Sequence, residues 1–187
     1  RNADAHYLLG LAYLADGKPE LGLMELKTVN QIGQFGKYAR EVPFRKKIAE
    51  LYQKFNQPEE ALKEYLLLVK KEPSNAEHYL QAGTLFEQRD QSDRASEFYR
   101  KAIELDAQNA EAQLLLGKLL YRNKKPLEAR EYLQRAVKAD PDLYEAYYFL
   151  GRIQKENKDH PAALAAFERA QKDPEYKVKA IVERGAT

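Results

Sequence analysis

The sequence predicts an all-α fold of the solenoid type, in which antiparallel helix pairs are stacked along the chain. The first observation is a fixed period: Gly83 recurs at Gly117 and Gly151, and 117 − 83 and 151 − 117 are both 34. A period of this size indicates units that bury their apolar faces only against neighbouring units. The second observation is that apolar residues recur at intervals of three and four, which is typical of amphipathic helices, and turn residues interrupt them regularly.

The repeated pattern consists of small, aromatic and aliphatic positions. In three consecutive copies these are Tyr79, Ala82, Gly83, Phe86, Ala95, Tyr99 and Ala102; Gln113, Leu116, Gly117, Leu120, Ala129, Leu133 and Ala136; and Tyr147, Leu150, Gly151, Gln154, Ala163, Phe167 and Ala170. An earlier copy contains Ile48, Ala49, Tyr52, Ala61, Tyr65, Leu68 and Pro73, and a looser first copy contains Leu9, Gly10, Tyr13, Gly22, Leu26 and Val29.

These five copies resemble the tetratricopeptide repeat, whose pattern is an aromatic residue, Leu-Gly, Tyr, Ala, an aromatic residue, a second Ala and a closing Pro. The resemblance covers nearly the whole chain. It implies a right-handed superhelix of about eleven helices. It also implies a non-catalytic scaffold that binds a segment of a partner protein in a concave groove and helps to assemble a multiprotein complex.

We expect residues 1–187 to form a single array. Its expected parts are units at about 3–34, 42–75, 76–109, 110–143 and 144–174, with a capping helix at 175–184. That last helix is either a cap or the first helix of a further unit. Because the chain begins with Arg1 rather than Met, we expect a fragment of a longer protein, and localisation stays open between a bacterial cell envelope and the cytoplasm.

The boundaries of the first helix pair follow from capping residues. Helices are expected at residues 3–15 and 19–30, with Asn2 as the N-cap and a turn at Asp16 and Gly17. Pro19 suits a first helical turn because its missing N–H has no helical partner there. The same argument places N-caps and second-helix starts in later units, at Asn75, Asn109, Pro58, Ser92, Pro126 and Pro161.

The sequence also predicts one packing feature of the repeat and one interruption of it. Small residues such as Gly117 and Gly151 are expected where the two helices of a pair approach closely, so larger side chains should clash there. Between the first two copies the interval is 39 residues (49 − 10), which inserts a loop near residues 32–40. This loop is either a tolerated connection, with Phe35 and Tyr38 tucked back or exposed, or a contact loop for a partner.

Composition excludes several function classes. The 31 basic and 29 acidic residues give a net charge of +2, which argues against nucleic-acid binding. There is no cysteine, no apolar run of membrane-spanning length and no nucleophile or phosphate-loop motif, so no enzyme activity, cofactor or metal is expected. The three histidines are expected to be exposed near helix starts, and the segment 59–64 is expected to be a solvated helix face.

The resemblance also implies where a partner binds, because ligand contacts in such proteins come from the non-packing side of the first helices. Carried over by offset, the candidate residues are Tyr7, Leu11 and Leu14; Lys46; Leu114, Lys118, Tyr121 and Arg122; and Tyr148, Arg152 and Lys155. Tyrosine combined with cations favours a protein or peptide partner that carries acidic residues and an apolar anchor. The alternative is that these are ordinary solvated helix positions.

Three other functions are alternatives to binding a partner in the groove. Chaperone-tail-binding relatives hold a terminal carboxylate with a Lys and two Asn; Lys46 stands at one such offset, but Glu50 and Thr84 replace the two Asn, which disfavours this function. Self-association through the end units is an alternative, since the apolar first helix lacks a preceding neighbour. The third is the repeat arm of a larger enzyme.

Overall fold

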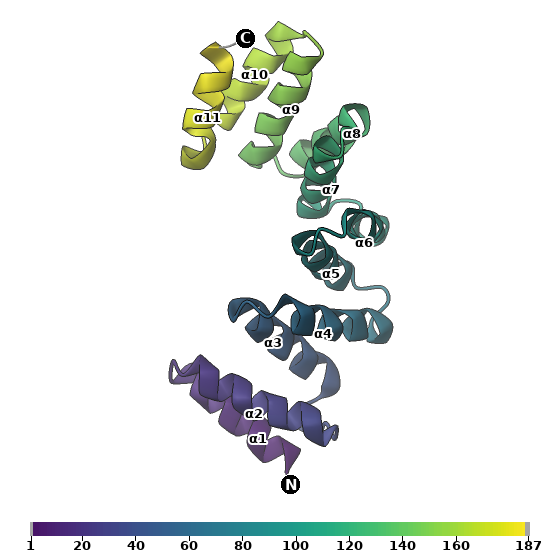
Figure 1. Ribbon diagram of the computed structural model, residues 1–187, viewed down its shortest axis with the longest axis vertical. Coiled ribbons are helices and arrows are strands. Elements are labelled where there is room, and N and C mark those ends of the chain that lie inside the picture. The colour runs from purple at the N-terminus through teal and green to yellow at the C-terminus, as the bar shows by residue number, and fades with distance from the viewer. Residues whose placement is uncertain (1, 186–187) are drawn as a thin grey trace. The chain divides into compact units, whose positions relative to one another are not determined.

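The computed structural model describes residues 2–185, and within them every element is an α-helix (Figure 1). The helices are α1 (Ala3–Ala15), α2 (Pro19–Ile32), α3 (Glu41–Lys54), α4 (Pro58–Lys71), α5 (Ala76–Gln88), α6 (Ser92–Leu105), α7 (Ala110–Arg122), α8 (Pro126–Ala139), α9 (Tyr144–Glu156), α10 (His160–Ala170) and α11 (Pro174–Gly185). The predicted all-α fold of helix pairs is confirmed. The start of α1 and the starts of α2, α4, α6 and α8 lie at the predicted residues.

Helix starts are set by local hydrogen bonds, as expected from the capping residues. The Asn2 side chain accepts from the backbone N–H groups of Asp4 and Ala5 at 3.0 and 3.4 Å. Asn75 accepts from the N–H of Glu77 at 3.1 Å, and Asn109 caps α7 in the same way. These side chains satisfy N–H groups that have no partner inside the helix, so three first helices are defined by the residue before them.

The turns inside the helix pairs share one strained position. Asn56, Asp90, Lys124 and Lys158 have φ values of 53°, 57°, 61° and 61°, and Gly17 has 70° at the corresponding place in the first pair. Each turn therefore passes through the left-handed region before the second helix begins. This geometry brings Lys124 to the junction of α7 and α8.

The chain divides into two compact units, one within residues 1–91 and one within residues 92–187. In the first unit, α1 packs against α2, α3 against α4, and α4 against α5. Its core contains the fully buried side chains of Leu26, Phe44, Ile48 and Leu68.

In the second unit, α7 packs against α8, α9 against α10, and α11 against both α9 and α10. The buried Tyr176 and Ala180 of α11 join a cluster with Phe167. The close helix contact predicted at glycine is present, because a Cβ added at Gly151 lies 2.6 Å from Cε1 of Phe167. At Gly117 the added Cβ lies 2.7 Å from Cγ of Leu133.

The inserted loop occupies residues 33–40 between α2 and α3. Phe35 is tucked back: its ring lies 5.1 Å from that of Phe44, and the Arg45 guanidinium lies 5.2 Å from the Phe35 ring centroid. The N–H of Tyr38 donates to Oδ1 of Asp4 at 3.3 Å, while the Tyr38 side chain is 50% exposed. The loop is therefore anchored to α1 and α3, with one tyrosine left on the surface.

Candidate partner-binding surface

Three predicted cations of the second unit lie on α7 and α9 and are paired with carboxylates of neighbouring helices. Nζ of Lys118 lies 2.6 Å from Oε1 of Glu145 at the start of α9. Arg152 and Lys155, one turn apart on α9, both reach Glu183 of α11, at 3.8 and 2.9 Å. The cations are therefore oriented and partly neutralised by the fold before any partner binds.

Tyr121 links the cationic side chains to an aromatic cluster. Its hydroxyl donates to the carboxylate of Glu156, and the Arg152 guanidinium lies 5.3 Å from the Tyr121 ring centroid. The ring of Phe149 meets it edge to face at 5.8 Å. Burial raises the pKa of Tyr121 to about 12, and the hydrogen bond to Glu156 acts in the same direction. The phenol therefore stays protonated at neutral pH, as a ring with a fixed donor and a cation on its face.

Two adjoining pockets open at this cluster. The larger, of about 400 Å³, is lined by Tyr121, Arg122, Lys124, Pro126, Arg152 and Glu156. The second, of about 340 Å³, is lined by Arg152, Lys155, Glu156 and Glu183. Because Arg152 and Glu156 line both, the pockets form one surface, which we call the α7–α9–α11 surface. Four cations and two carboxylates line it, so it can hold an acidic chain segment beside an aromatic ring.

The structure adds residues that the repeat offsets did not predict. Lys124 and Pro126 reach the larger pocket from the α7–α8 turn, which the family offsets for first helices do not include. Glu183 comes from α11, which lies beyond the repeat pattern, so no periodic signal could have found it. Glu156 is different, because it occupies the repeat position of Arg122 in the next copy (156 − 122 is 34), so the period could have indicated it.

Other predicted residues have different surroundings. Leu114 is 5% exposed and lies in the core, so it offers almost no area to a partner. Tyr148 is half-buried, and its ring lies 5.5 Å from that of Tyr176 and 6.2 Å from that of Phe167. These aromatic contacts make Tyr148 mainly a packing residue between α9, α10 and α11.

The remaining predicted residues belong to the first compact unit. Lys46 is exposed on α3. Tyr7 is half-buried, with its ring edge to face against Phe44 at 6.4 Å. Leu11 and Leu14 are half-buried on α1, and Cδ2 of Leu14 fills the space beside Gly22. These residues and the α7–α9–α11 surface therefore belong to different compact units.

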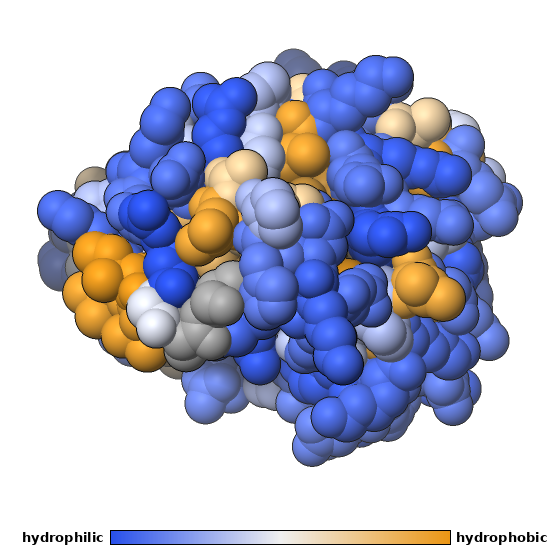
Figure 2. Space-filling model, turned by 90° about the horizontal axis from the view of Figure 1, so that it is seen from above, coloured by the Kyte–Doolittle hydropathy of each residue, from blue (hydrophilic) through white to orange (hydrophobic). Residues whose placement is uncertain are grey.

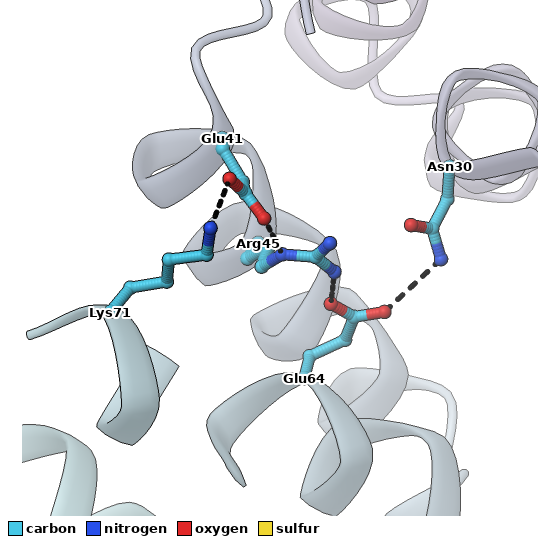
Figure 3. A network of polar contacts seen from close by, with 5 residues as sticks. All are labelled: Asn30, Glu41, Arg45, Glu64 and Lys71. Atoms are coloured by element: carbon cyan, nitrogen blue, oxygen red, sulfur yellow. Dashed lines mark hydrogen bonds and ion pairs between the residues drawn. The ribbon is translucent and has the colours of Figure 1, made fainter. Parts of the chain in front are cut away.

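A buried polar network in the first unit corrects one prediction (Figure 3). Glu64, expected on a solvated face, has a side chain only 6% exposed; it accepts from Nη1 of Arg45 at 2.6 Å and from Nδ2 of Asn30 at 3.1 Å. Arg45 also donates through Nε to Glu41 at 3.1 Å, and Lys71 lies 2.9 Å from Glu41. The hydrogen bond from Lys71 lowers the pKa of Glu41. The network joins α2, α3 and α4 across the lengthened junction.

Two of the three histidines each lie beside a carboxylate. His78, expected to be exposed, has a side chain only 2% exposed, and its Nε2 lies 2.7 Å from Oε2 of Glu72. Nδ1 of His6 lies 2.6 Å from Oε2 of Glu25. Within residues 2–185 no three His, Asp or Glu side chains are grouped to hold a metal ion. In the same part of the chain, no helix is both long and apolar enough to span a membrane.

Comparison with known proteins adds a family and a fold. The family model described as tetratricopeptide repeat matches residues 46–112, 80–143 and 114–177, which together span more than half of the chain. No curated protein matches the sequence significantly.

Three solved structures illustrate the likeness of fold. MamA protein is 20% identical with a TM-score of 0.78, and 95% of this chain and 94% of that chain are covered. YrrB, described as a TPR protein with an unusual peptide-binding site, is 16% identical with a TM-score of 0.76. The match covers 98% of this chain and 92% of the YrrB chain. PilF of Pseudomonas aeruginosa is 19% identical with a TM-score of 0.71. The match covers 91% of this chain and 75% of the PilF chain.

Proposed function

Because the chain belongs to the tetratricopeptide repeat family, whose fold is a protein-interaction scaffold, we propose that it binds an acidic segment of a partner protein on the α7–α9–α11 surface. The observation that carries this proposal is the Tyr121 ring, with the Arg152 guanidinium on its face, between two adjoining pockets. A partner carboxylate meets Arg152 and Lys155, and an apolar anchor meets Tyr121. Such binding holds the partner in a multiprotein complex without catalysis.

The internal ion pairs are weak enough to be exchanged for a ligand. The side chains of Arg152, Lys155 and Glu183 are 39%, 25% and 26% exposed, so all three are partly within reach of solvent. Exposed ion pairs contribute only about 0–1 kcal/mol. An incoming carboxylate therefore replaces Glu183 at small cost. Tyrosine and arginine in a partly desolvated pocket are the residue types that contribute most to binding at interfaces.

The peptide-binding site named for YrrB supports a peptide as the ligand class. We expect selection from a display library of 12-residue peptides to enrich Asp or Glu next to an aromatic or aliphatic residue. The double variant Arg152→Glu/Lys155→Glu is expected to lose this enrichment, with at least tenfold weaker binding of a selected peptide in fluorescence polarisation. The matched control is Lys172→Glu/Lys177→Glu, which changes the charge equally at two exposed residues and should bind normally.

A triple variant distinguishes a direct loss of the binding surface from an indirect effect in which α11 no longer packs against α9. Adding Glu183→Lys to the double variant restores opposite charges between α9 and α11 while the cations of the surface stay reversed. We expect it to melt like the parent protein and still to fail in peptide binding. An acidic consensus selected equally by the parent and the double variant contradicts the proposal, as does a parent that enriches no acidic sequence.

Self-association is a second candidate function, favoured by exposed hydrophobic side chains. Val178 and Val182 of α11 are 68% and 66% exposed, and Leu8 of α1 and Met24 of α2 are 47% and 55% exposed. Figure 2 shows one face of the molecule as mainly hydrophilic, interrupted by hydrophobic patches. Large apolar side chains in such patches are typical of interaction sites.

Light scattering over a concentration series tests self-association. If α11 stacks on another copy, the mass rises above 21.6 kDa with concentration, and Val178→Glu/Val182→Glu returns it to the monomer value. A parent protein that remains monomeric at every concentration rejects this function.

A further inference from the structure

One repeat of the second unit lacks a ring that its neighbours carry. The position held by Tyr147 in the fifth copy and by Tyr79 in the third is Gln113 in the fourth, since 147 − 113 and 113 − 79 are both 34. Gln113 is only 2% exposed. Its Nε2 donates to the backbone carbonyl of Ala107 at 2.7 Å, while its buried Oε1 has no hydrogen-bond partner among the described residues.

The smaller amide leaves a hollow where the third and fifth copies carry a ring. A pocket of about 280 Å³ lies here, formed by the end of α6, the following turn, α7 and the end of α8. Its lining residues are Ile103, Ala107, Gln108, Gln113, Arg135, Lys138 and Ala139. None of these lines the pockets of the α7–α9–α11 surface. Pockets for small molecules have volumes of about 300–1,000 Å³, so this hollow suits one side chain rather than a whole ligand.

The fifth copy shows in the same chain what fills the corresponding place. There the guanidinium of Arg169 lies 5.7 Å from the ring centroid of Tyr147, and Tyr147 packs against the buried cluster that contains Phe167. Arg135 is the counterpart of Arg169, because 169 − 135 is 34. At the fourth copy the cation is therefore kept and the ring beneath it is missing; the ring that Arg135 does contact is that of Tyr132, at 5.5 Å.

The charges around the hollow indicate what accompanies the ring. Arg135 and Lys138 are both exposed, and neither forms an ion pair within residues 2–185. Two cations without an acidic partner, beside a hollow whose lining includes Ile103, Ala107 and Ala139, favour a ligand that carries a carboxylate next to its ring. The unsatisfied oxygen of Gln113 additionally favours a ring with a hydrogen-bond donor, which it can accept once the amide turns toward the pocket.

We propose that this hollow binds a tyrosine side chain of a partner protein, followed in the partner by an acidic residue. The partner's tyrosine ring occupies in the fourth copy the place that corresponds to that of Tyr147 in the fifth copy. Its face lies toward Arg135 and its hydroxyl toward Gln113. The neighbouring carboxylate meets Lys138. This site is separate from the α7–α9–α11 surface, so failure of either proposal leaves the other standing.

The test uses the whole chain and an acetylated, amidated hexapeptide with the sequence Ser-Gly-Tyr-Asp-Gly-Ser. Titration followed by ¹⁵N NMR is expected to shift the signals of the Gln113 side-chain amide, Ala107 and Arg135, with a dissociation constant of about 0.1–1 mM for a single anchor. Replacing the tyrosine of the peptide with leucine should weaken binding at least tenfold. Replacing its aspartate with asparagine should weaken binding about threefold.

Gln113→Tyr is the decisive variant because it supplies the missing ring within the chain. We expect it to fold with a Tm equal to or above that of the parent protein and to lose peptide binding at least tenfold. Arg135→Glu should also weaken binding at least fivefold, whereas the matched Arg169→Glu, where the ring is already present, should leave it unchanged. Arg135→Glu keeps the test valid if Gln113→Tyr fails to fold.

Two results overturn the proposal. One is a folded Gln113→Tyr variant that binds the peptide as tightly as the parent. The other is a parent protein whose signals around Gln113 do not move with the tyrosine peptide, which means that the hollow holds only water.

Discussion

Replacing Glu64 with alanine is expected to destabilise the protein by about 3–5 kcal/mol, because it leaves the guanidinium of Arg45 buried without its main partner. The side chains of Arg45 and Glu64 are 11% and 6% exposed, and their atoms lie 2.6 Å apart. The same change removes the acceptor for Asn30 of α2. The measurement is urea unfolding followed by circular dichroism at 222 nm.

The matched control is Glu60→Ala, one turn earlier on the same helix. Glu60 pairs with Lys63 at 2.8 Å, but both side chains are well exposed, at 45% and 65%. Its loss should cost less than about 1 kcal/mol. Replacing the buried pair together, as Arg45→Met/Glu64→Leu, should recover most of the stability, because neither charge is then left unpaired. Equal effects of Glu64→Ala and Glu60→Ala contradict the account of a buried ion pair.

The second large effect is expected at Gly151. Valine there should destabilise the protein by about 1–3 kcal/mol, because its side chain enters a contact that is already closed. Even a bare Cβ lies 2.6 Å from Cε1 and 2.7 Å from Cδ1 of Phe167, whose ring is fully buried. Since Phe167 belongs to the cluster with Tyr176 and Ala180, the ring cannot move without displacing α11.

Urea unfolding also measures the effect at Gly151, with Gly185→Ala as the control. No heavy atom lies within 4 Å of a Cβ built on Gly185, so that change should alter stability by less than about 0.5 kcal/mol. A Gly151→Val variant as stable as the parent means that α9 and α10 are not in close contact at this glycine.

The helices could be predicted closely from the sequence because their ends depend on neighbouring residues. The Asn2 side chain accepts from N–H groups two and three residues ahead. Pro19 suits the first turn of α2 because a backbone N–H at that position would have no partner inside the helix. The 34-residue period likewise predicts which positions face a neighbouring helix. Because repeat packing is local in sequence, the period and the resemblance to a repeat family were sufficient to predict the fold.

The candidate site was predicted only in part. Lys118 and Arg152 occupy one repeat position, since 152 − 118 is 34, and one helical turn places Lys155 beside Arg152. Their partners were not predictable in this way: Glu145 and Glu183 come from the starts or ends of other helices, and Glu183 lies outside the period. Leu114 illustrates the same limit. Its repeat position matches a ligand-contacting position of the family, but that position does not determine the solvent exposure of the side chain, which is only 5%.

The sequence by itself determined the helices, their caps, the repeat and the close contacts at glycine, because each depends on residues a few positions apart or on a fixed period. Only the tertiary structure decided which charges are neutralised, that Glu64 and His78 are buried, and that Gln113 leaves a hollow beneath Arg135. These features depend on the distance between side chains of different helices. Burial and pairing of charge are set by that distance, and residue type alone does not determine it.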